Sequence, residues 1–372
     1  SMESDNKLFL LDAYALIYRA YYAFIKNPRI NSKGFNTSAI LGFVNTLEEV
    51  LKKENPTHIG VAFDPAGPTF RHEAFEQYKA QREETPEAIR LSVPIIKEII
   101  RAYRIPILEV AGYEADDVIG TLATEAGRQG IITYMMTPDK DYGQLVSDKV
   151  FMYRPKHTGG FEVMGVDEVK AKFDIQSPAQ VIDMLGLMGD SSDNIPGCPG
   201  VGEKTAQKLI AEFGSIENLL EHTDQLKGAL KTKVETNREM ITFSKFLATI
   251  KIDVPIQLDM DSLVREQADE DSLRQIFEEL EFRTLIDRVL KKENAGNGIT
   301  TPTGNKTAAE KSNLAPLPLF PEEGGAVQGD LFANFTGNEP GEAKNSNLAT
   351  LETLNCDYQL IDTEEKLSLI HI

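Results

Sequence analysis

The chain has 372 residues, 41% of them hydrophobic, and a formal net charge of −19 at pH 7. This composition is that of a water-soluble globular protein, and the length suits two domains or one large domain with tails. The sequence has no apolar run long enough to span a membrane, no signal-peptide pattern and only two cysteines. We therefore expect a cytoplasmic protein without a disulfide framework. The negative charge does not exclude nucleic acid, because many acids fall in one candidate metal site and in a polar C-terminal tail.

Three short apolar runs each end in acids: "KLFLLDA" at 7–13, "HIGVAFD" at 58–64 and "GIITYMMTPDKD" at 130–141. Apolar residues recur with helical spacing at 38–52, 92–103, 115–128 and 204–213. Strands that alternate with helices predict an α/β fold with a mostly parallel central sheet flanked by helices. We expect this α/β core to end near residue 180.

The pattern from residue 181 to residue 292 is wholly helical, with short Gly/Pro turns between the helices. The stretch "DEDSLRQIFEELEFRTLIDRVL" at 269–290 is predicted to form one last helix. The composition of residues 293–355 is rich in Gly, Asn, Thr and Pro and predicts a disordered linker. Residues 356–372 regain a strand-then-helix pattern and resemble the opening of a further domain.

Nine acids are candidate metal ligands, because they follow predicted strands or crowd together at turns and helix starts. They are Asp12, Asp64, Asp139 and Asp141 after strands, Glu114, Asp116 and Asp117 in "GYEADDVIG", and Asp190 and Asp193 in "MGDSSDNIPG". The carboxyl ends of parallel strands meet at one edge of a sheet, where ligands bind. A set of oxygen ligands suits Mg²⁺ or Mn²⁺, and two such ions can assist an in-line phosphoryl displacement.

Taken singly, each of these acids fits a helix cap or a turn better than a metal site, and only the joint pattern favours metal. An EF-hand interpretation of Asp139 and Asp141 fails, because Gln144 and Val150 stand where the loop requires Gly and Glu. Without metal, we expect mutual repulsion to strain "GYEADDVIG" and to raise the pKa values of its carboxylates.

A glycine-rich stretch, "IPGCPGVGEKTAQKLI", lies directly before one of the predicted helices. It predicts a helix–hairpin–helix turn, whose backbone N–H groups can approach a DNA phosphate at the start of the next helix. The candidate DNA contacts of this turn and helix are Gly197, Gly200, Gly202, Lys204, Thr205 and Lys208. A plain Gly/Pro turn between two packed helices is the alternative.

The stretch "TFRHEAFEQYKAQREETPEAIR" at 69–90 mixes basic and aromatic residues shortly after Asp64. If it is helical, Lys79 and Arg82 can reach one phosphate, and Tyr78 can stack on a base. Such a mixture of charges is more often a solvated face, and that alternative stays open. Tyr22, in an aromatic cluster after the first strand, fits the core better than DNA but stays a candidate base contact.

Five stretches together resemble, in the family's order, the N-terminal 5′ nuclease domain of bacterial DNA polymerase I, in the flap endonuclease superfamily. They are "LLDAYALIYRAYYAF", "VAFDPAGPTFRHEAFEQYKAQR", "GYEADDVIGTLA", "TPDKDYGQLV" and "GDSSDNIPGCPGVGEKTA", spread over most of residues 8–215. The chain departs from the family pattern at Ala13, where Gly is usual, at Tyr142, where Leu is commoner, and at Cys198–Pro199. None of these departures removes a candidate ligand.

The resemblance implies a PIN-like 5′ nuclease fold with a helical arch, and two-metal cleavage of 5′ flaps and nicked duplexes. It implies one metal region held by Asp12, Asp64, Glu114 and Asp116, and a second held by Asp117, Asp139, Asp141, Asp190 and Asp193. It places Lys79 and Arg82, with Tyr78 and Arg71, near the scissile phosphate, and a K⁺ ion at the Gly197–Gly202 turn. In the linker, "QGDLF" resembles a peptide that docks on the sliding clamp, through Gln328, Leu331 and Phe332.

We therefore expect residues 1–292 to be a monomeric, metal-dependent 5′ nuclease that removes 5′ flaps or RNA primers in DNA replication and repair. The resemblance also implies proofreading-like and polymerase domains after the linker, of which the chain carries only the first residues, so we expect no DNA synthesis. A noncatalytic, structure-specific DNA-binding module is the main alternative. A nuclease for single-stranded RNA is a third interpretation, which the glycine hairpin disfavours.

Overall fold

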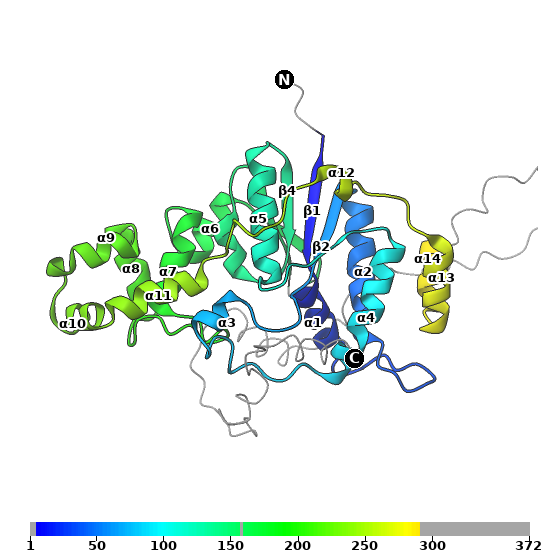
Figure 1. The fold of residues 1–372 in the computed structure, drawn as a ribbon, viewed down its shortest axis with the longest axis horizontal. Helices are drawn as coiled ribbons and strands as arrows, with labels where there is room; N and C mark the ends of the chain where they lie inside the picture. Colours follow the sequence, from blue (N-terminus) through cyan, green and yellow to red (C-terminus); the bar gives the residue numbers. More distant parts are fainter. Residues whose placement is uncertain (1–4, 157–158, 291–372) are drawn as a thin grey trace, which may run out of the picture.

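The computed structural model describes residues 5–156 and 159–290, with a six-stranded sheet at its centre (Figure 1). The strands are β1 (Lys7–Asp12), β2 (His58–Ala62), β3 (Ile107–Leu108), β4 (Ile132–Met136), β5 (Val150–Pro155) and β6 (Phe161–Met164). Their order in space is β3-β2-β1-β4-β5-β6, and every neighbouring pair is parallel except β5 with β6. The predicted mostly parallel sheet is confirmed, and the strands that were not predicted lie toward its two edges.

The helices follow the strands in the first half of the chain and make up nearly all of the second half. The helices before β6 are α1 (Ala13–Ala23), α2 (Ser38–Lys53), α3 (Phe70–Ala74), α4 (Glu87–Ala102) and α5 (Ala115–Arg128). Those after it are α6 (Val166–Phe173), α7 (Val181–Met188), α8 (Glu203–Phe213), α9 (Ile216–Glu221), α10 (Gly228–Thr236), α11 (Arg238–Ala248), α12 (Met260–Leu263), α13 (Glu270–Glu279) and α14 (Arg283–Leu290). Short 3₁₀ turns lie at η1 (Lys140–Leu145), η2 (Pro178–Gln180) and η3 (Thr223–Gln225).

The central strand β1 is buried on both faces and divides the interior into two cores. Leu8 and Leu10 belong to the core that includes α5, and Phe9 and Leu11 belong to the core that includes α2 and α4. Figure 1 shows α5 on one side of the sheet and α1, α2 and α4 on the other. Because a parallel strand covered on both faces needs apolar residues at every position, "LFLL" is a continuous apolar run.

The helices α2, α5 and α8 match their predicted ranges to within one residue. The helix α4 begins at Glu87, directly after Pro86, rather than at residue 92. The prediction of one helix over 269–290 is wrong, because the chain breaks between α13 and α14. Glu281 has a left-handed φ of 63° there, and the Phe282 N–H donates back to the Phe277 carbonyl at 2.8 Å. This is a Schellman-type helix end, in which the Phe277 and Phe282 side chains pack together.

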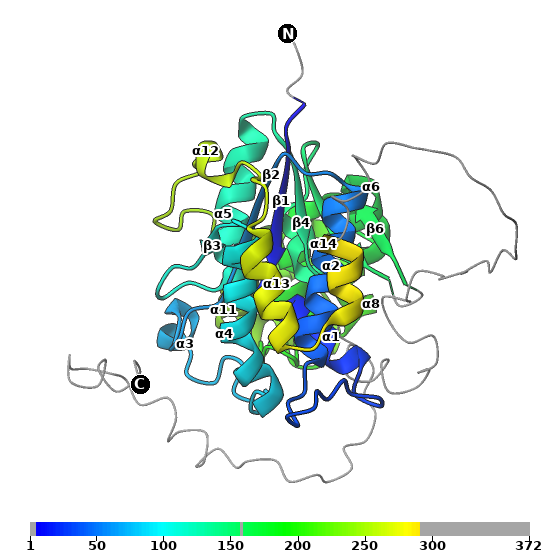
Figure 2. The ribbon, with the colours of Figure 1, turned by 90° about the vertical axis from the view of Figure 1, so that its right-hand side faces the viewer.

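The last two helices return to the α/β core instead of extending the helical region. Leu273, Phe277 and Leu285 are buried in the same core as α2 and α4, and Figure 2 shows α13 and α14 beside these helices. The expected helical region at 181–292 therefore divides, and its final part belongs to the α/β body. Among the described residues, no helix has the length and apolar character needed to cross a bilayer.

Candidate metal centre

Three of the predicted acids lie side by side at the carboxyl edge of the sheet. Asp12 ends β1, which lies between β2 and β4, while Asp64 follows β2 and Asp139 follows β4. The Asp64 Oδ1 atom accepts a hydrogen bond of 2.7 Å from the N–H of Ala115, the first residue of α5. This bond ties the end of β2 to the start of α5, so the acids of "GYEADDVIG" face the acids of the strand ends.

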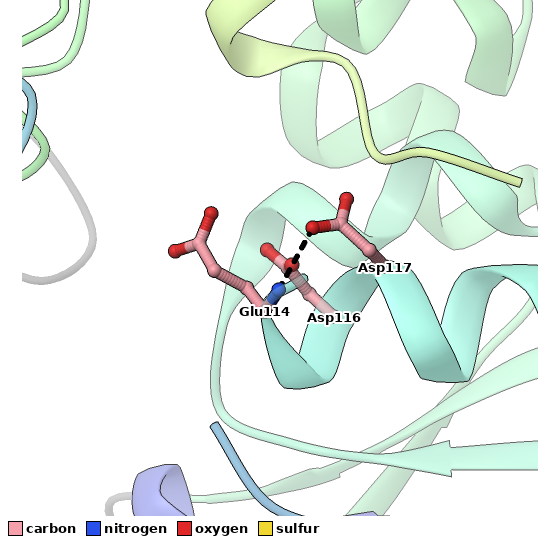
Figure 3. A group of neighbouring side chains, drawn as sticks. All are labelled: Glu114, Asp116 and Asp117. Carbon is pink, nitrogen blue, oxygen red and sulfur yellow. Dashed lines mark hydrogen bonds between the residues drawn. The ribbon is translucent and has the colours of Figure 1, made fainter. Parts of the chain in front are cut away.

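Six acids form two groups, in each of which the ligand oxygens lie within 4.8 Å of one another. The first group is Glu114, Asp116 and Asp117 at the start of α5 (Figure 3), and the second is Asp141, Asp190 and Asp193 from η1 and the loop after α7. Two unit charges of like sign about 4 Å apart repel by roughly 4 kcal/mol at an effective dielectric near 20. Each group therefore needs compensating positive charge.

Asp117 receives its compensation from the protein itself. Its carboxylate accepts two bonds of 2.8 Å from Arg71 and one of 2.8 Å from the Lys251 N–H. The fourth bond, of 3.1 Å, comes from the Glu114 N–H and is drawn dashed in Figure 3. Asp117 is fully buried, and these four bonds use the acceptor positions of both oxygens. The structure therefore shows the Asp117 oxygens bound to donors of the protein itself, and its predicted place among the ligands stays a prediction.

Arg71 is likewise buried, with an exposed fraction of 1%, so its predicted place at the phosphate is not the one the structure shows. Besides Asp117 and Glu114, its guanidinium binds the carbonyl oxygens of Leu247 at 2.9 Å and Thr249 at 2.7 Å. These contacts use all five of its N–H donors. Arg71 thus joins the start of α5, which carries the first acid group, to the segment that follows α11.

Glu114 is the acid of the first group whose charge is neutralised by basic side chains of residues 69–90. Its carboxylate pairs with Lys79 and Arg71 and accepts a bond of 3.2 Å from the Tyr78 hydroxyl. Burial alone would raise the pKa of Glu114, but Lys79 and Arg71 lower it to about 2. The expectation of raised pKa values throughout "GYEADDVIG" is therefore wrong for Glu114. The Tyr78 ring is buried, with 4% exposed, and its predicted stacking on a base stays a prediction.

Two carboxylate oxygens, one in each group, are buried without any hydrogen-bond partner: Asp116 Oδ1 and Asp141 Oδ1. Burial and the neighbouring charges of Asp117 and Glu114 raise the pKa of Asp116 well above its usual range. Burial, with Asp139 and Asp190, does the same to the pKa of Asp141. A buried anionic oxygen without a donor is costly unless a cation binds it. The residues present therefore fit two divalent-cation positions, one per group.

The acids at the ends of β1 and β4 also have raised pKa values. Burial and the charge of Asp64 raise the pKa of Asp12 to about 7, and burial and the charge of Asp193 raise the pKa of Asp139 to about 6. Both values lie above the ordinary 3.8 of an aspartate. The metal-free folded protein therefore holds protons on these two groups that the unfolded chain has already released.

The stability of the metal-free protein is expected to fall as the pH rises from about 5 to about 7.5, because the unfolded state binds fewer protons than the folded state in this window. Glu114 does not oppose this trend, since its lowered pKa adds stability that is already complete above pH 4.5. Saturating Mg²⁺ at the upper pH should restore the melting temperature. Thermal unfolding followed by circular dichroism, with chelator or with Mg²⁺, measures both effects. A melting temperature in chelator that is constant or rises over this window contradicts the expectation.

The segment between α3 and α4, for which a helix was one interpretation, is a series of turns, with Lys79 at a φ of 57°. It is fastened to the loop that carries the second acid group. The Lys79 N–H donates to the Asp193 carbonyl at 2.9 Å, Arg82 pairs with the Asp193 carboxylate, and the Asn194 amide donates to the Gln77 carbonyl at 2.7 Å. Lys79 and Arg82 thus lie at the acid groups, each paired with a candidate ligand, and their predicted contact with a phosphate stays a prediction.

The glycine turn between α7 and α8 has the geometry that requires glycine. Gly197 and Gly200 have φ values of 63° and 82° in the left-handed region. A Cβ atom at Gly197 would lie 2.3 Å from the Gly189 nitrogen, so no other residue fits without moving the backbone. The sequence prediction of a hairpin between two helices agrees with this arrangement.

The predicted DNA contacts after the turn have mixed surroundings. Gly202 precedes α8 as its N-cap, Lys204 and Lys208 are exposed on that helix, and Thr205 is partly buried. Tyr22 is partly buried in α1, with its ring 5.1 Å from that of Tyr21. The two lysines are therefore accessible to a ligand, and Tyr22 packs mainly within its own aromatic cluster.

Sequence reasoning missed Gln144, which joins the turn that carries the candidate ligand Asp141 to the chain after α11. Its side-chain amide donates to the carbonyls of Asp141 and Ala248, both at 3.0 Å, and its Oε1 accepts from the Ile250 N–H at 2.8 Å. Together with Arg71 it binds the chain that leaves α11. The one signal that could have found it was its place inside the quoted stretch "TPDKDYGQLV".

A mostly parallel sheet with acids at its carboxyl edge, followed by helices with a glycine hairpin, defines the class of 5′ nucleases. Two family profiles match this division: "5'-3' exonuclease, N-terminal resolvase-like domain" over residues 7–174, and "5'-3' exonuclease, C-terminal SAM fold" over residues 176–271. The chain belongs to the 5′–3′ exonuclease family, and the resemblance noted from its motifs is confirmed. It carries the nuclease domains of this class of enzyme.

The curated relatives include bacterial DNA polymerases. DNA polymerase I of Bacillus caldotenax is 42% identical over 287 residues, which are 76% of this chain and 32% of that protein. DNA polymerase I of Bacillus subtilis is 43% identical over 291 residues, 77% of this chain and 33% of that protein. The chain thus spans about a third of the length of these relatives.

Solved structures share the fold. The 5′-exonuclease of phage T5 with bound divalent metal ions (zinc) has a TM-score of 0.58 at 20% identity, covering 74% of this chain and 99% of that one. The catalytic core of Rad2 in complex with DNA substrate has a TM-score of 0.51 at 18% identity, covering 74% of this chain and 88% of that one. These similarities confirm the predicted nuclease fold.

Proposed function

We propose that residues 5–290 form a divalent-metal-dependent 5′ nuclease that hydrolyses phosphodiesters at 5′ flaps, nicks and RNA primers on duplex DNA. The observation that carries the proposal is the pair of acid groups, each with one buried carboxylate oxygen that lacks a donor. The proposal includes a monomeric, cytoplasmic protein acting in replication and repair, as expected from the family resemblance.

We assign the metal ligands in two regions, with Mg²⁺ or Mn²⁺ as the ions that fit oxygen ligands. The first region comprises Asp12, Asp64, Glu114 and Asp116, and the second comprises Asp139, Asp141, Asp190 and Asp193. Asp117 is left out, because Arg71 and two backbone N–H groups occupy its oxygens. When bound, the ions lower the pKa of water and offset the phosphate charge.

Lys79 and Arg82 are the cations that bind the phosphate in this proposal. In the described structure they pair with Glu114 and Asp193, which are themselves proposed ligands. Were divalent cations bound at Glu114 and Asp193, they would share these carboxylates, and the Lys79 and Arg82 side chains could donate charge-assisted hydrogen bonds to a phosphate. The two side chains would orient the scissile phosphate at the acid groups. The Tyr78 hydroxyl would hold the Glu114 carboxylate in place through its hydrogen bond.

The glycine turn and α8 would hold the duplex away from the site of cleavage. The exposed Lys204 and Lys208 supply positive charge beside the start of α8, where backbone N–H groups favour an anion. Contacts of this kind bind the DNA backbone without reading its sequence. We also propose a K⁺ ion on the backbone carbonyls of the Gly197–Gly202 turn, on the strength of the family resemblance.

Incubation with a labelled 5′-flap duplex tests the proposal directly. We expect release of the flap with Mg²⁺ or Mn²⁺, no release with chelator, and weaker cleavage of a plain single strand. An intact flap with both metals would contradict the proposal. If the protein then still bound the flap duplex, the noncatalytic DNA-binding module would be supported instead.

The predicted clamp contacts Gln328, Leu331 and Phe332 lie outside the described residues, as do the linker and the segment 356–372. Docking of this segment on a sliding clamp stays a proposal from the motif "QGDLF". A peptide spanning residues 322–338, titrated against a bacterial clamp, measures it, and a scrambled peptide is the matched control.

A further inference from the structure

Tyr142 is a buried residue of the metal centre that the proposed mechanism leaves without a role. It lies in η1, immediately after the candidate ligand Asp141, and its side chain is fully buried. Its hydroxyl donates a hydrogen bond of 2.9 Å to Asp12 Oδ2. One residue therefore connects the acid at the end of β1 with the loop that carries the second acid group.

The bond from Tyr142 is the shortest one that Asp12 receives from the described residues. Oδ2 also lies 3.5 Å from the Thr137 hydroxyl, and Oδ1 accepts only a bond of 3.4 Å from the Ala15 N–H. The two hydroxyls thus occupy Oδ2 and leave acceptor capacity at Oδ1. A carboxylate held in this way has one oxygen fixed and the other available to a cation.

We propose that Tyr142 is a positioning residue of the metal centre, whose hydroxyl fixes the Asp12 carboxylate for binding a divalent cation. This inference rests on the proposed function and names a residue that acts through Asp12. Outer partners of this kind orient the ligands, and their loss typically lowers metal affinity or activity about 10- to 100-fold.

The test compares Tyr142→Phe, which removes only the hydroxyl, with Tyr153→Phe. Tyr153 is a matched control, because its buried side chain lies in the core that includes α2 and α4 and donates to the Glu54 carboxylate at 3.1 Å. Two measurements are needed: Mn²⁺ affinity by calorimetry without DNA, and flap cleavage as a function of Mg²⁺ concentration. Melting temperatures in chelator show whether each variant folds.

We expect Tyr142→Phe to weaken Mn²⁺ binding and to raise the half-saturating Mg²⁺ concentration about 10- to 100-fold. The cleavage rate at saturating Mg²⁺ should stay within a few-fold of wild type, and Tyr153→Phe should change none of these values. In an Asp12→Asn background, Tyr142→Phe should have no further effect on Mn²⁺ affinity, because its hydroxyl acts through that carboxylate.

Wild-type metal dependence in Tyr142→Phe overturns the inference, whether or not its melting temperature changes. If Tyr142→Phe does not fold, Tyr142→Leu takes its place, since it also removes the hydroxyl and keeps an apolar side chain at this buried position. A wild-type protein that binds Mn²⁺ but cleaves no flap contradicts the proposed function, while the calorimetric comparison still decides the role of Tyr142.

Discussion

Asp116→Asn is expected to reduce flap cleavage at least about a thousandfold while leaving binding of the flap duplex in chelator unchanged. The substitution keeps the shape of the side chain but puts an uncharged amide where Asp116 Oδ1 now lies buried without a partner. Metal ions supply several kcal/mol of stabilisation to the charge of the transition state, and each 1.36 kcal/mol is about tenfold in rate. Cleavage rates and fluorescence anisotropy of a labelled flap measure the two effects.

The same variant should not destabilise the metal-free protein. The pKa of Asp116 is raised by burial and by Asp117 and Glu114, so the charged form is disfavoured in the folded state. A neutral side chain removes that repulsion, and the melting temperature in chelator should stay the same or rise. Asp167→Asn, at an exposed acid in the first turn of α6, is the control and should retain full activity. Cleavage at the wild-type rate by Asp116→Asn would remove Asp116 from the proposed ligands.

The positions of the acids followed from the sequence because they depend on local rules. Each apolar run ends in an acid, and parallel strands align their carboxyl ends, so Asp12, Asp64 and Asp139 had to share one edge. The helix over 115–128 could be predicted from the sequence for the same reason, because its apolar spacing and acidic first turn are both local signals.

The partners of those acids did not follow from the sequence, because they come from distant parts of the chain. Arg71 reaches Glu114 and Asp117 across 43 and 46 positions, and the Leu247 carbonyl across 176. No periodicity in 69–90 distinguishes an arginine that binds phosphate from one buried under the site. The burial of Tyr78 has the same origin, since it depends on turns that fasten this segment to the loop of Asp193.

This division between local and distant signals explains why nine acids were named and eight remain proposed ligands. Crowded carboxylates in a sequence indicate that cations are needed, but they do not say whether the cation is a metal or a side chain. In "GYEADDVIG" two neighbouring aspartates differ in this respect. Asp117 is satisfied by the Arg71 guanidinium, and Asp116 keeps an oxygen without a partner.

Arg71→Met is expected to lower the free energy of unfolding by about 3–5 kcal/mol, because it leaves the buried Asp117 carboxylate without its charge partner. At about 2–4 °C per kcal/mol for a domain of this size, the melting temperature should fall by on the order of 10 °C. Urea unfolding monitored by circular dichroism measures the free energy. The control Arg90→Met breaks an exposed pair with Glu87, and it should cost no more than about 0.5 kcal/mol.

A second substitution separates the unpaired charge from the lost packing. Adding Asp117→Leu to Arg71→Met removes the stranded carboxylate, and the double variant should recover part of the stability, since apolar replacement of a buried pair is often nearly neutral. Recovery would show that Arg71 serves to neutralise Asp117, while the carbonyls of Leu247 and Thr249 stay without a donor in both variants. If Arg71→Met unfolds no more easily than Arg90→Met, Arg71 is free to leave its buried position. The placement of Arg71 at the phosphate, predicted from the motifs, would then regain its support.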